Sequence, residues 1–186
     1  MAGCNDYSQL LGRMGPFAKL MVREVRGNVG KINGTYATNP EALRSARALL
    51  ETEKNNGLHR EGGQLADPSS AMGLLWARRG LSFWAAVFEG LAEAEDSGDG
   101  AVQVKKVAGA AYDEMLRPYN GWMTRSSFSM AINHMPDWES LQSRLGSSRA
   151  EVAADMHAWA TLARQLVSRL KAMHTELDLE DSRKSI

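Results

Sequence analysis

Three polar side chains recur on one side of the segment Pro16–Tyr36, which otherwise has the pattern of an amphipathic helix. Glu24, Asn28 and Lys31 are four and three residues apart, so on a helix they lie within about 60° of one another. Apolar residues are expected on that side, and burying a carboxylate, an amide and an ammonium without partners is costly. The three therefore either form a hydrated network at the rim of the protein or bind a polar ligand. Their donors, acceptors and single positive charge suit a hydroxyl-rich or anionic head group.

An indole lies beside basic residues in the segment Ala71–Glu93. Trp76 belongs to an apolar stripe, with Arg79 at its edge and Arg78 further round the helix. A tryptophan in such a stripe is commonly a core residue. A flat indole beside hydrogen-bond donors is also how proteins hold sugar rings, through contact on the ring face and polar groups at the rim. Both interpretations stay open from the spacing alone. The other members of the stripe are Met72, Phe83 and Val87.

The residues needed for catalysis or metal binding are sparse. The single cysteine, Cys4, excludes an internal disulfide framework and a cysteine-based zinc cage. The histidines lack metal-ligand spacing, and no serine lies in a nucleophile elbow. We therefore expect no metal, no cofactor and no catalytic residue, and hence not an enzyme. The histidines are His59, His134, His157 and His174.

Charge and hydropathy narrow the class of protein further. The 22 Lys and Arg residues balance 22 Asp and Glu residues, so no excess of positive charge draws the chain onto nucleic acid. No apolar run is long enough to span a bilayer, and Met1–Leu10 lacks the apolar core of a signal peptide. We expect a soluble, cytoplasmic protein without a nucleic-acid partner.

Helical periodicity dominates the chain, and no stretch alternates apolar and polar residues as a strand would. The 186 residues suit a single all-α domain, residues 1–186. Asn39, and Ser69 or Ser70, are predicted N-caps, and Glu93–Gly100 is predicted to be an acidic turn. The expected helices are Asp6–Leu11, Pro16–Tyr36, Pro40–Lys54, Ala71–Glu93, Ala101–Leu116, Tyr119–Met135, Asp137–Leu145 and Ser148–Glu176.

Three segments together resemble the glycolipid transfer protein family. Glu24–Tyr36 (EVRGNVGKINGTY), followed by ATNP, is similar to the family's helix with an acidic residue, Asn and Lys at this spacing. Leu74–Phe83 (LLWARRGLSF) is similar to the family's tryptophan-bearing helix. Ala111–Trp122 (AYDEMLRPYNGW) is the third segment. They occur in the family's order, and the resemblance extends from Pro16 to the end of the chain.

The resemblance implies a two-layer, all-α sandwich of about eight helices that encloses an apolar lipid pocket. It also implies non-enzymatic transfer of glycosphingolipids between membranes, by a monomer that contacts membrane surfaces transiently. Asn28 and Lys31 would hydrogen-bond the sugar of the head group. The acidic residue would accept hydrogen bonds from the sphingoid amide or from sugar hydroxyls, and the tryptophan would stack on the first sugar ring. The candidate head-group residues are Glu24, Asn28, Lys31, Trp76 and Asn120, with Arg78 and Arg79 as candidate contacts to an anionic group.

A lipid carrier must also cover the aliphatic chains. Exposing a chain to water costs roughly 0.8 kcal/mol per methylene, so two long chains cost on the order of 20 kcal/mol. The chain has 10 methionines, whose flexible thioethers suit a pocket for chains of varied length. The candidate chain-pocket residues are Phe17, Met21, Met72, Phe83, Val87, Phe128 and Ile132.

A cluster near the ends of neighbouring helices has the composition of a membrane-docking surface. It is either ordinary packing or an aromatic patch that rests at the level of the lipid head groups. The resemblance places Trp122 in the family's docking surface. The candidate docking residues are Trp122, Met123, Arg125 and Trp138.

Two positions depart from the family's pattern. Glu24 stands where the family usually has Asp, and Asn120 stands where it usually has His. Asn can still donate a hydrogen bond, although its reach is shorter and it does not titrate. One alternative function is a phosphosphingolipid (ceramide-1-phosphate-like) transfer protein, in which Lys31 and the two arginines clamp a phosphate. Another is a helical lipid-sensing or interaction module without transfer activity.

Overall fold

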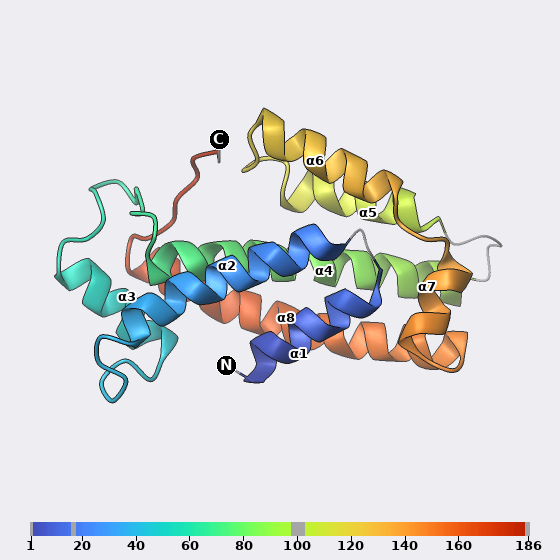
Figure 1. Cartoon of the computed structure of the whole chain (residues 1–186), viewed down its shortest axis with the longest axis horizontal. Helices are drawn as coiled ribbons and strands as arrows, with labels where there is room; N and C mark the ends of the chain where they lie inside the picture. The colour runs from blue at the N-terminus through green and yellow to red at the C-terminus, as the bar shows by residue number, and fades with distance from the viewer. Residues whose placement is uncertain (1, 16–17, 98–102, 185–186) are drawn as a thin grey trace.

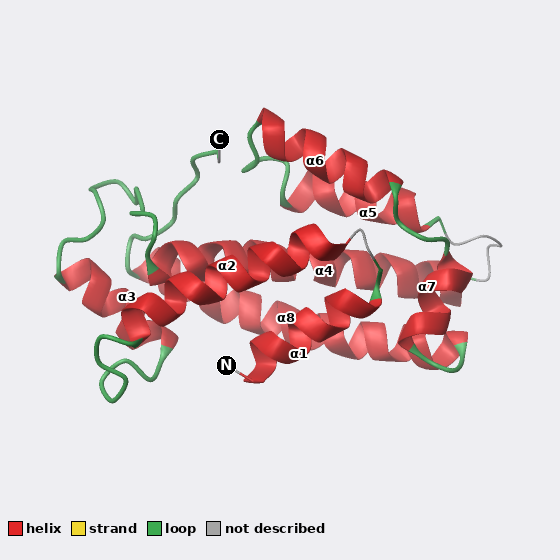
Figure 2. Ribbon diagram, in the orientation of Figure 1, coloured by secondary structure: helices red, strands yellow, loops and turns green. Residues whose placement is uncertain are grey.

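The chain is helical over most of its length. The computed structural model describes residues 2–15, 18–97 and 103–184, which contain eight helices and no strand. Figure 2 shows that loops make up the remainder, the longest of them before α4. The helices are α1 (Ala2–Arg13), α2 (Lys19–Tyr36), α3 (Ala46–Asn55), α4 (Ser70–Asp96), α5 (Val104–Met115), α6 (Trp122–Asn133), α7 (Trp138–Leu145) and α8 (Arg149–Glu176).

Helix α4 lies at the centre of the architecture (Figure 1). It packs along α8, which runs in the opposite direction, and it also contacts α2, α3 and α5. Helices α1 and α2 pack against each other and form a layer over the α4–α8 pair. Helices α5 and α6 form a hairpin at the upper right of Figure 1. The predicted two-layer, all-α fold is confirmed.

Three apolar clusters hold these layers together, the smallest of which joins Ala85 of α4 to Ala160 and Ala163 of α8. The first, called here the larger cluster, contains buried residues of α1, α2 and α4 to α8, and in it Phe83 packs edge-on against Trp84 and Phe128, at ring-centroid distances of 5.1 and 5.9 Å. Burying a side chain of this kind contributes about 1.5–3 kcal/mol. A second one, called here the smaller cluster, lies at the α3 end of the molecule and consists of Leu50, Leu65, Ala71, Leu75 and Leu179.

Short polar side chains set the beginnings of several helices. The Ser69 hydroxyl accepts a hydrogen bond from the backbone N–H of Met72 at 3.0 Å, which confirms it as the N-cap of α4. Asp137 caps α7 and Ser148 caps α8 in the same way. Each satisfies one of the backbone N–H groups that the first turn of a helix leaves without a partner.

The prediction of a helix over Pro40–Lys54 is wrong at its beginning. Asn39 accepts from the backbone N–H of Ala42 at 3.2 Å, but this closes only a turn. The helix begins at Ala46, where Ser45 is extended and its hydroxyl accepts from the Ala48 N–H. At the other predicted boundaries, α1 is longer than Asp6–Leu11, and α4 continues to Asp96 through the first part of the predicted acidic turn.

A buried carboxylate joins three helices at the start of α4. Glu53, on α3, is 3 % exposed. Its carboxylate accepts from the backbone N–H groups of Ser70 and Ala71, at 2.5 and 2.9 Å, and from the Thr35 hydroxyl at the end of α2, at 2.6 Å. A carboxylate at a helix N-terminus interacts favourably with the helix dipole. Glu53 therefore fixes the ends of α2 and α3 to the beginning of α4.

Glu53→Ala should lower the free energy of unfolding by about 2–4 kcal/mol, because it leaves buried backbone N–H groups without an acceptor. Urea denaturation followed by circular dichroism measures this change. Glu51→Ala is the matched control, since Glu51 lies two residues away and only joins a half-exposed ion pair with Arg47. We expect a change below about 0.5 kcal/mol for Glu51→Ala. Equal effects of the two substitutions would contradict the capping role of Glu53.

Candidate functional site

The polar residues of α2 lie where this helix crosses α4. The crossing is close because Gly73 has no side chain: a Cβ there would be 2.8 Å from the backbone oxygen of Asn28 and 3.3 Å from the Cβ of Lys31. Asn28 is 8 % exposed. Trp76 follows Gly73 by three residues on α4, which is a little less than one helical turn. The fold thus brings Asn28 and Lys31 to the part of α4 that carries Trp76.

The two charged members of the α2 stripe have different surroundings. The Lys31 ammonium is 2.7 Å from the Asp67 carboxylate in the loop before α4, and 26 % of its side chain is exposed. Glu24 is exposed one turn before Asn28, and no other described residue forms an ion pair with it. Glu24 therefore lies at the solvent edge of the site and forms no ion pair with Lys31, which pairs with Asp67 instead.

Arg79 connects Trp76 to the turn between α5 and α6. Its guanidinium carbon lies 4.8 Å from the Trp76 ring centroid and 3.7 Å from the Tyr119 ring centroid. Arg79 is 6 % exposed, and it donates a hydrogen bond to the backbone oxygen of Asp181. Burial lowers the pKa of Arg79, because a low-dielectric environment disfavours the charged form. Arg79 was among the predicted site residues, whereas Tyr119 was not, although it directly precedes the predicted residue Asn120.

Asn120 faces the interior of the α5–α6 hairpin. It is 2 % exposed, and its side-chain amide donates to the Tyr112 hydroxyl at 3.3 Å. The Tyr112 ring in turn stacks on Phe128, with centroids 4.6 Å apart. Asn120 is thus one residue from the Tyr119 ring that covers Arg79, and its amide is held by α5.

Arg78 points away from Trp76, and its role as a contact to an anionic head group stays a prediction. Residues two apart on a helix differ in direction by about 200°. Arg78 forms a two-pronged ion pair with Glu180 of the C-terminal segment, with one N–O distance of 2.8 Å, and is 8 % exposed. Its guanidinium is therefore neutralised within the protein.

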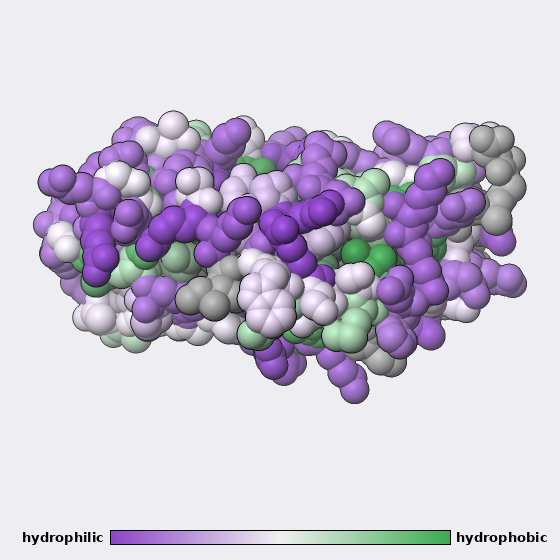
Figure 3. All heavy atoms as spheres, turned by 90° about the horizontal axis from the view of Figure 1, so that it is seen from above, coloured by the Kyte–Doolittle hydropathy of each residue, from purple (hydrophilic) through white to green (hydrophobic). Residues whose placement is uncertain are grey.

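The four candidate docking residues divide into two groups. Trp122 and Met123, at the start of α6, are 75 % and 54 % exposed. Met130 on the same helix is 58 % exposed and was missed, although it lies two turns further on. Figure 3 looks onto the molecule from above, where apolar and weakly polar spheres interrupt a largely hydrophilic surface.

The other two candidate docking residues are engaged within the fold. Arg125 donates to the backbone oxygens of Asn120 and Arg117, at 2.9 and 3.1 Å. Trp138 is 4 % exposed and its indole N–H donates to Glu95 at 2.6 Å. The Trp138 ring fills the core where α7 begins, and its role in membrane docking stays a prediction.

Most candidate chain-pocket residues lie together. Met21, Phe83, Val87, Phe128 and Ile132 are all buried in the larger apolar cluster. Met72 is half-buried against the smaller cluster, so it is separated from the others. Phe17 lies outside the described residues.

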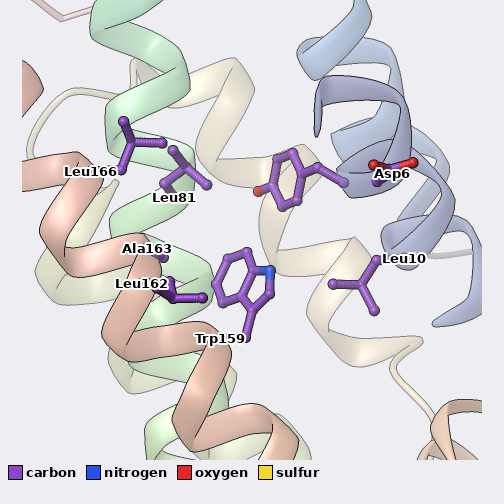
Figure 4. A pocket seen from close by; sticks show the side chains of 8 residues that line it. Asp6, Leu10, Leu81, Trp159, Leu162, Ala163 and Leu166 are labelled. Atoms are coloured by element: carbon purple, nitrogen blue, oxygen red, sulfur yellow. The ribbon is translucent and has the colours of Figure 1, made fainter. Parts of the chain in front are cut away.

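A cavity of about 460 Å³ lies elsewhere, between α1, α4 and α8 (Figure 4). It is lined by Tyr7 and Leu10 of α1, Leu81 of α4, and Trp159 and neighbouring residues of α8. Leu81 precedes Phe83 by two residues, so the two side chains point to opposite sides of α4. None of the candidate chain-pocket residues lines this cavity. Leu166 on α8 also lines this cavity and is 47 % exposed.

The described residues hold no cluster of three or more His, Cys, Asp or Glu side chains with the geometry of a metal site. Within the same residues, no helix combines the length and the apolar character needed to cross a membrane.

Comparison with known proteins places these features in a family context. The sequence model of the family described as Glycolipid transfer protein (GLTP) matches residues 1–147. Glycolipid transfer protein of Xenopus tropicalis is 29% identical over 113 residues, which are 61% of this chain and 52% of the relative. Pleckstrin homology domain-containing family A member 8 of Mus musculus is 26% identical over 185 residues, which are 98% of this chain and 33% of the relative. The chain spans about half the length of the first of these relatives.

Solved structures share the fold at low sequence identity. The structure described as "How FAPP2 Selects Simple Glycosphingolipids Using the GLTP-fold" has a TM-score of 0.79 at 20% identity, covering 99% of this chain and 87% of that one. Human ceramide-1-phosphate transfer protein in complex with 2:0 ceramide-1-phosphate has a TM-score of 0.83 at 18% identity, covering 97% and 86%.

Gly73→Ala should lower the free energy of unfolding by about 1 kcal/mol or more, since the added Cβ meets the Asn28 backbone and overpacks the α2–α4 crossing. This should occur although Ala favours a helix over Gly by about 1 kcal/mol. Gly80→Ala on the same helix is the matched control, because nothing lies within 4 Å of its added Cβ. Chemical denaturation of both variants should show opposite signs. A stabilised Gly73→Ala variant would mean that the two helices do not cross this closely.

Proposed function

The chain belongs to the glycolipid transfer protein family, and from this premise we propose that it carries glycosphingolipids between membranes without altering them chemically. The observation that carries the proposal is the position of Trp76, half-buried on α4 one turn from the crossing that holds Asn28 and Lys31. Indole faces suit sugar rings, and an amide with an ammonium suits sugar hydroxyls. This combination supports a neutral, hydroxyl-rich head group.

The lipid chains in this proposal lie along the same face of α4 as Trp76. Phe83 and Val87 follow Trp76 by seven and eleven residues, which are about two and three turns. Both belong to the larger apolar cluster together with Phe128 of α6. Because these side chains pack against each other, a chain can enter only when α6 moves away from α4. The protein must cover the aliphatic chains fully, because exposing them to water is costly.

Exposed apolar residues of α6 support a role for this helix at the membrane surface. Trp122, Met123 and Met130 are each more than half exposed, and tryptophan prefers the interface between lipid and water. The carrier would then approach a bilayer with the helix that must move to admit a chain. Transient membrane contact by a monomer, and a cytoplasmic location, belong to the same proposal.

A phosphosphingolipid cargo is the second candidate. It is favoured by the structural likeness to human ceramide-1-phosphate transfer protein and by the buried guanidinium of Arg79. Against it, Lys31 already pairs with Asp67 and Arg78 with Glu180. These ion pairs leave fewer free cations for a phosphate dianion.

Native mass spectrometry of the purified protein, followed by vesicle-to-vesicle transfer of glycosylceramide and of ceramide-1-phosphate, tests the proposal. We expect a bound glycosphingolipid and faster transfer of the glycosylated lipid. Preferential transfer of ceramide-1-phosphate would favour the second candidate. Binding without transfer would identify a lipid-sensing module, and lipid turnover during incubation would identify an enzyme.

Trp76→Ala should reduce glycolipid transfer at least tenfold and leave helix content unchanged, because it removes the stacking surface but little of the core. Fluorescent glycolipid transfer and circular dichroism measure the two effects. Trp159→Ala is the control, since Trp159 is another half-buried tryptophan that packs against Tyr7 and Phe88 on α1 and α4. It should lower stability while keeping the preference for glycosylated lipid. Transfer at the wild-type rate by Trp76→Ala would assign the indole to packing.

Trp122→Ala should weaken binding to lipid vesicles several-fold without changing the head-group preference, because it removes an exposed aromatic anchor. Vesicle co-sedimentation and competition between lipids measure the two properties. Leu162→Ala, on α8, removes a side chain that is 66 % exposed and should leave vesicle binding unchanged. An altered lipid preference with intact vesicle binding would place Trp122 in the lipid pocket instead.

A further inference from the structure

Arg79 is a buried cation held mainly by aromatic rings. Its guanidinium lies over Trp76 and Tyr119, at 4.8 and 3.7 Å from the ring centroids. No carboxylate among the described residues lies within ion-pairing distance of it, and its Nε has no hydrogen-bond partner. A buried charge without a carboxylate partner is costly, so the two ring faces provide much of what stabilises it. The same contacts hold both rings against the guanidinium.

The C-terminal segment supplies a fixed anchor for this guanidinium. Arg79 donates to the backbone oxygen of Asp181. The Asp181 carboxylate is 5 % exposed and accepts from the backbone N–H of Leu65 at 3.0 Å. The backbone of Glu180 lies so close to Gly63 that a Cβ there would be 2.6 Å from the Glu180 oxygen. Arg79 is thus attached at its end to a segment that is itself tied to the loop before α4.

The two rings belong to different parts of the proposed head-group site. Trp76 lies on α4, near the α2 crossing, whereas Tyr119 precedes Asn120 in the turn between α5 and α6. Stacking on one guanidinium sets the spacing between these parts. It also covers part of one face of the Trp76 indole.

We propose that Arg79 is a positioning residue of the head-group site, which holds the Trp76 indole and the Tyr119–Asn120 turn at the spacing that a sugar requires. This inference rests on the proposed glycolipid function. Arg79 acts through Trp76 and contacts no sugar itself. Its planar guanidinium is essential to the role, because the ammonium of lysine is a compact point charge that cannot stack on two rings.

The test compares Arg79→Met and Arg79→Lys with the wild-type protein. The measured quantity is the ratio of affinities for glucosylceramide and for ceramide with the same chains, each presented in phosphatidylcholine vesicles. Thermal unfolding monitors stability in parallel, and Arg79→Lys guards against a methionine variant that fails to fold. Arg164→Met is the control, since Arg164 pairs with Glu89 between α8 and α4 and contacts neither ring. Both Arg79 variants should lower the ratio about tenfold, whereas the control should keep it.

A double-mutant cycle separates positioning from simple loss of packing. In a Trp76→Ala background, Arg79→Met should lower the affinity ratio much less than it does in the wild-type protein, because one of the two groups that Arg79 positions is absent. Independent, additive effects would overturn the inference, as would a wild-type ratio for Arg79→Lys. If Trp76→Ala alone leaves the ratio unchanged, the proposed sugar site fails and this inference fails with it. If Trp76→Ala lowers the ratio but both Arg79 variants keep it, the inference alone fails.

Discussion

The close crossing of α2 over α4 at Gly73 is the constraint on which the rest of the site depends. Two helices approach this closely only where a side chain is absent, and a Cβ at this glycine would meet the α2 backbone itself. The crossing brings polar residues of one helix to the aromatic face of the other without a loop between them. Sites built on packed helices hold their geometry better than sites on loops. The buried Glu53 carboxylate reinforces the arrangement, since it attaches the end of α2 to the beginning of α4.

The sequence predicts the helices well where a local signal decides the structure. Ser69 is an N-cap because its hydroxyl serves the next turn of the same helix, and this chemistry is visible in the residue type alone. Asn39 has the same chemistry, but its hydrogen bond closes only a turn. The helix begins after Ser45, whose backbone is extended as an N-cap requires. Local propensity offers both residues as caps. Tertiary packing chooses between them.

Helical spacing predicted only part of the site. Spacing places Asn28, Lys31 and Trp76 on defined faces, but it does not identify which tryptophan is buried. Trp122 and Trp138 both lie at the start of a helix, yet one is 75 % exposed and the other is 4 % exposed with its indole bonded to Glu95. The same limit applies to the cations. Arg78 and Arg79 are adjacent in sequence, and their different roles depend on Glu180 and Asp181, which lie about a hundred residues further along the chain.

That dependence on distant residues has a consequence for how the protein is made. The C-terminal segment contacts Arg78, Arg79 and Leu65, which are separated from it by 102 to 118 residues. Closing such long loops costs entropy, and contacts of this range form late in folding. During synthesis α4 leaves the ribosome well before residues 179–183 do. Arg78 and Arg79 are therefore made before Glu180 and Asp181, the residues that they contact in the folded protein. The site reaches its finished form only when this segment has emerged and docked.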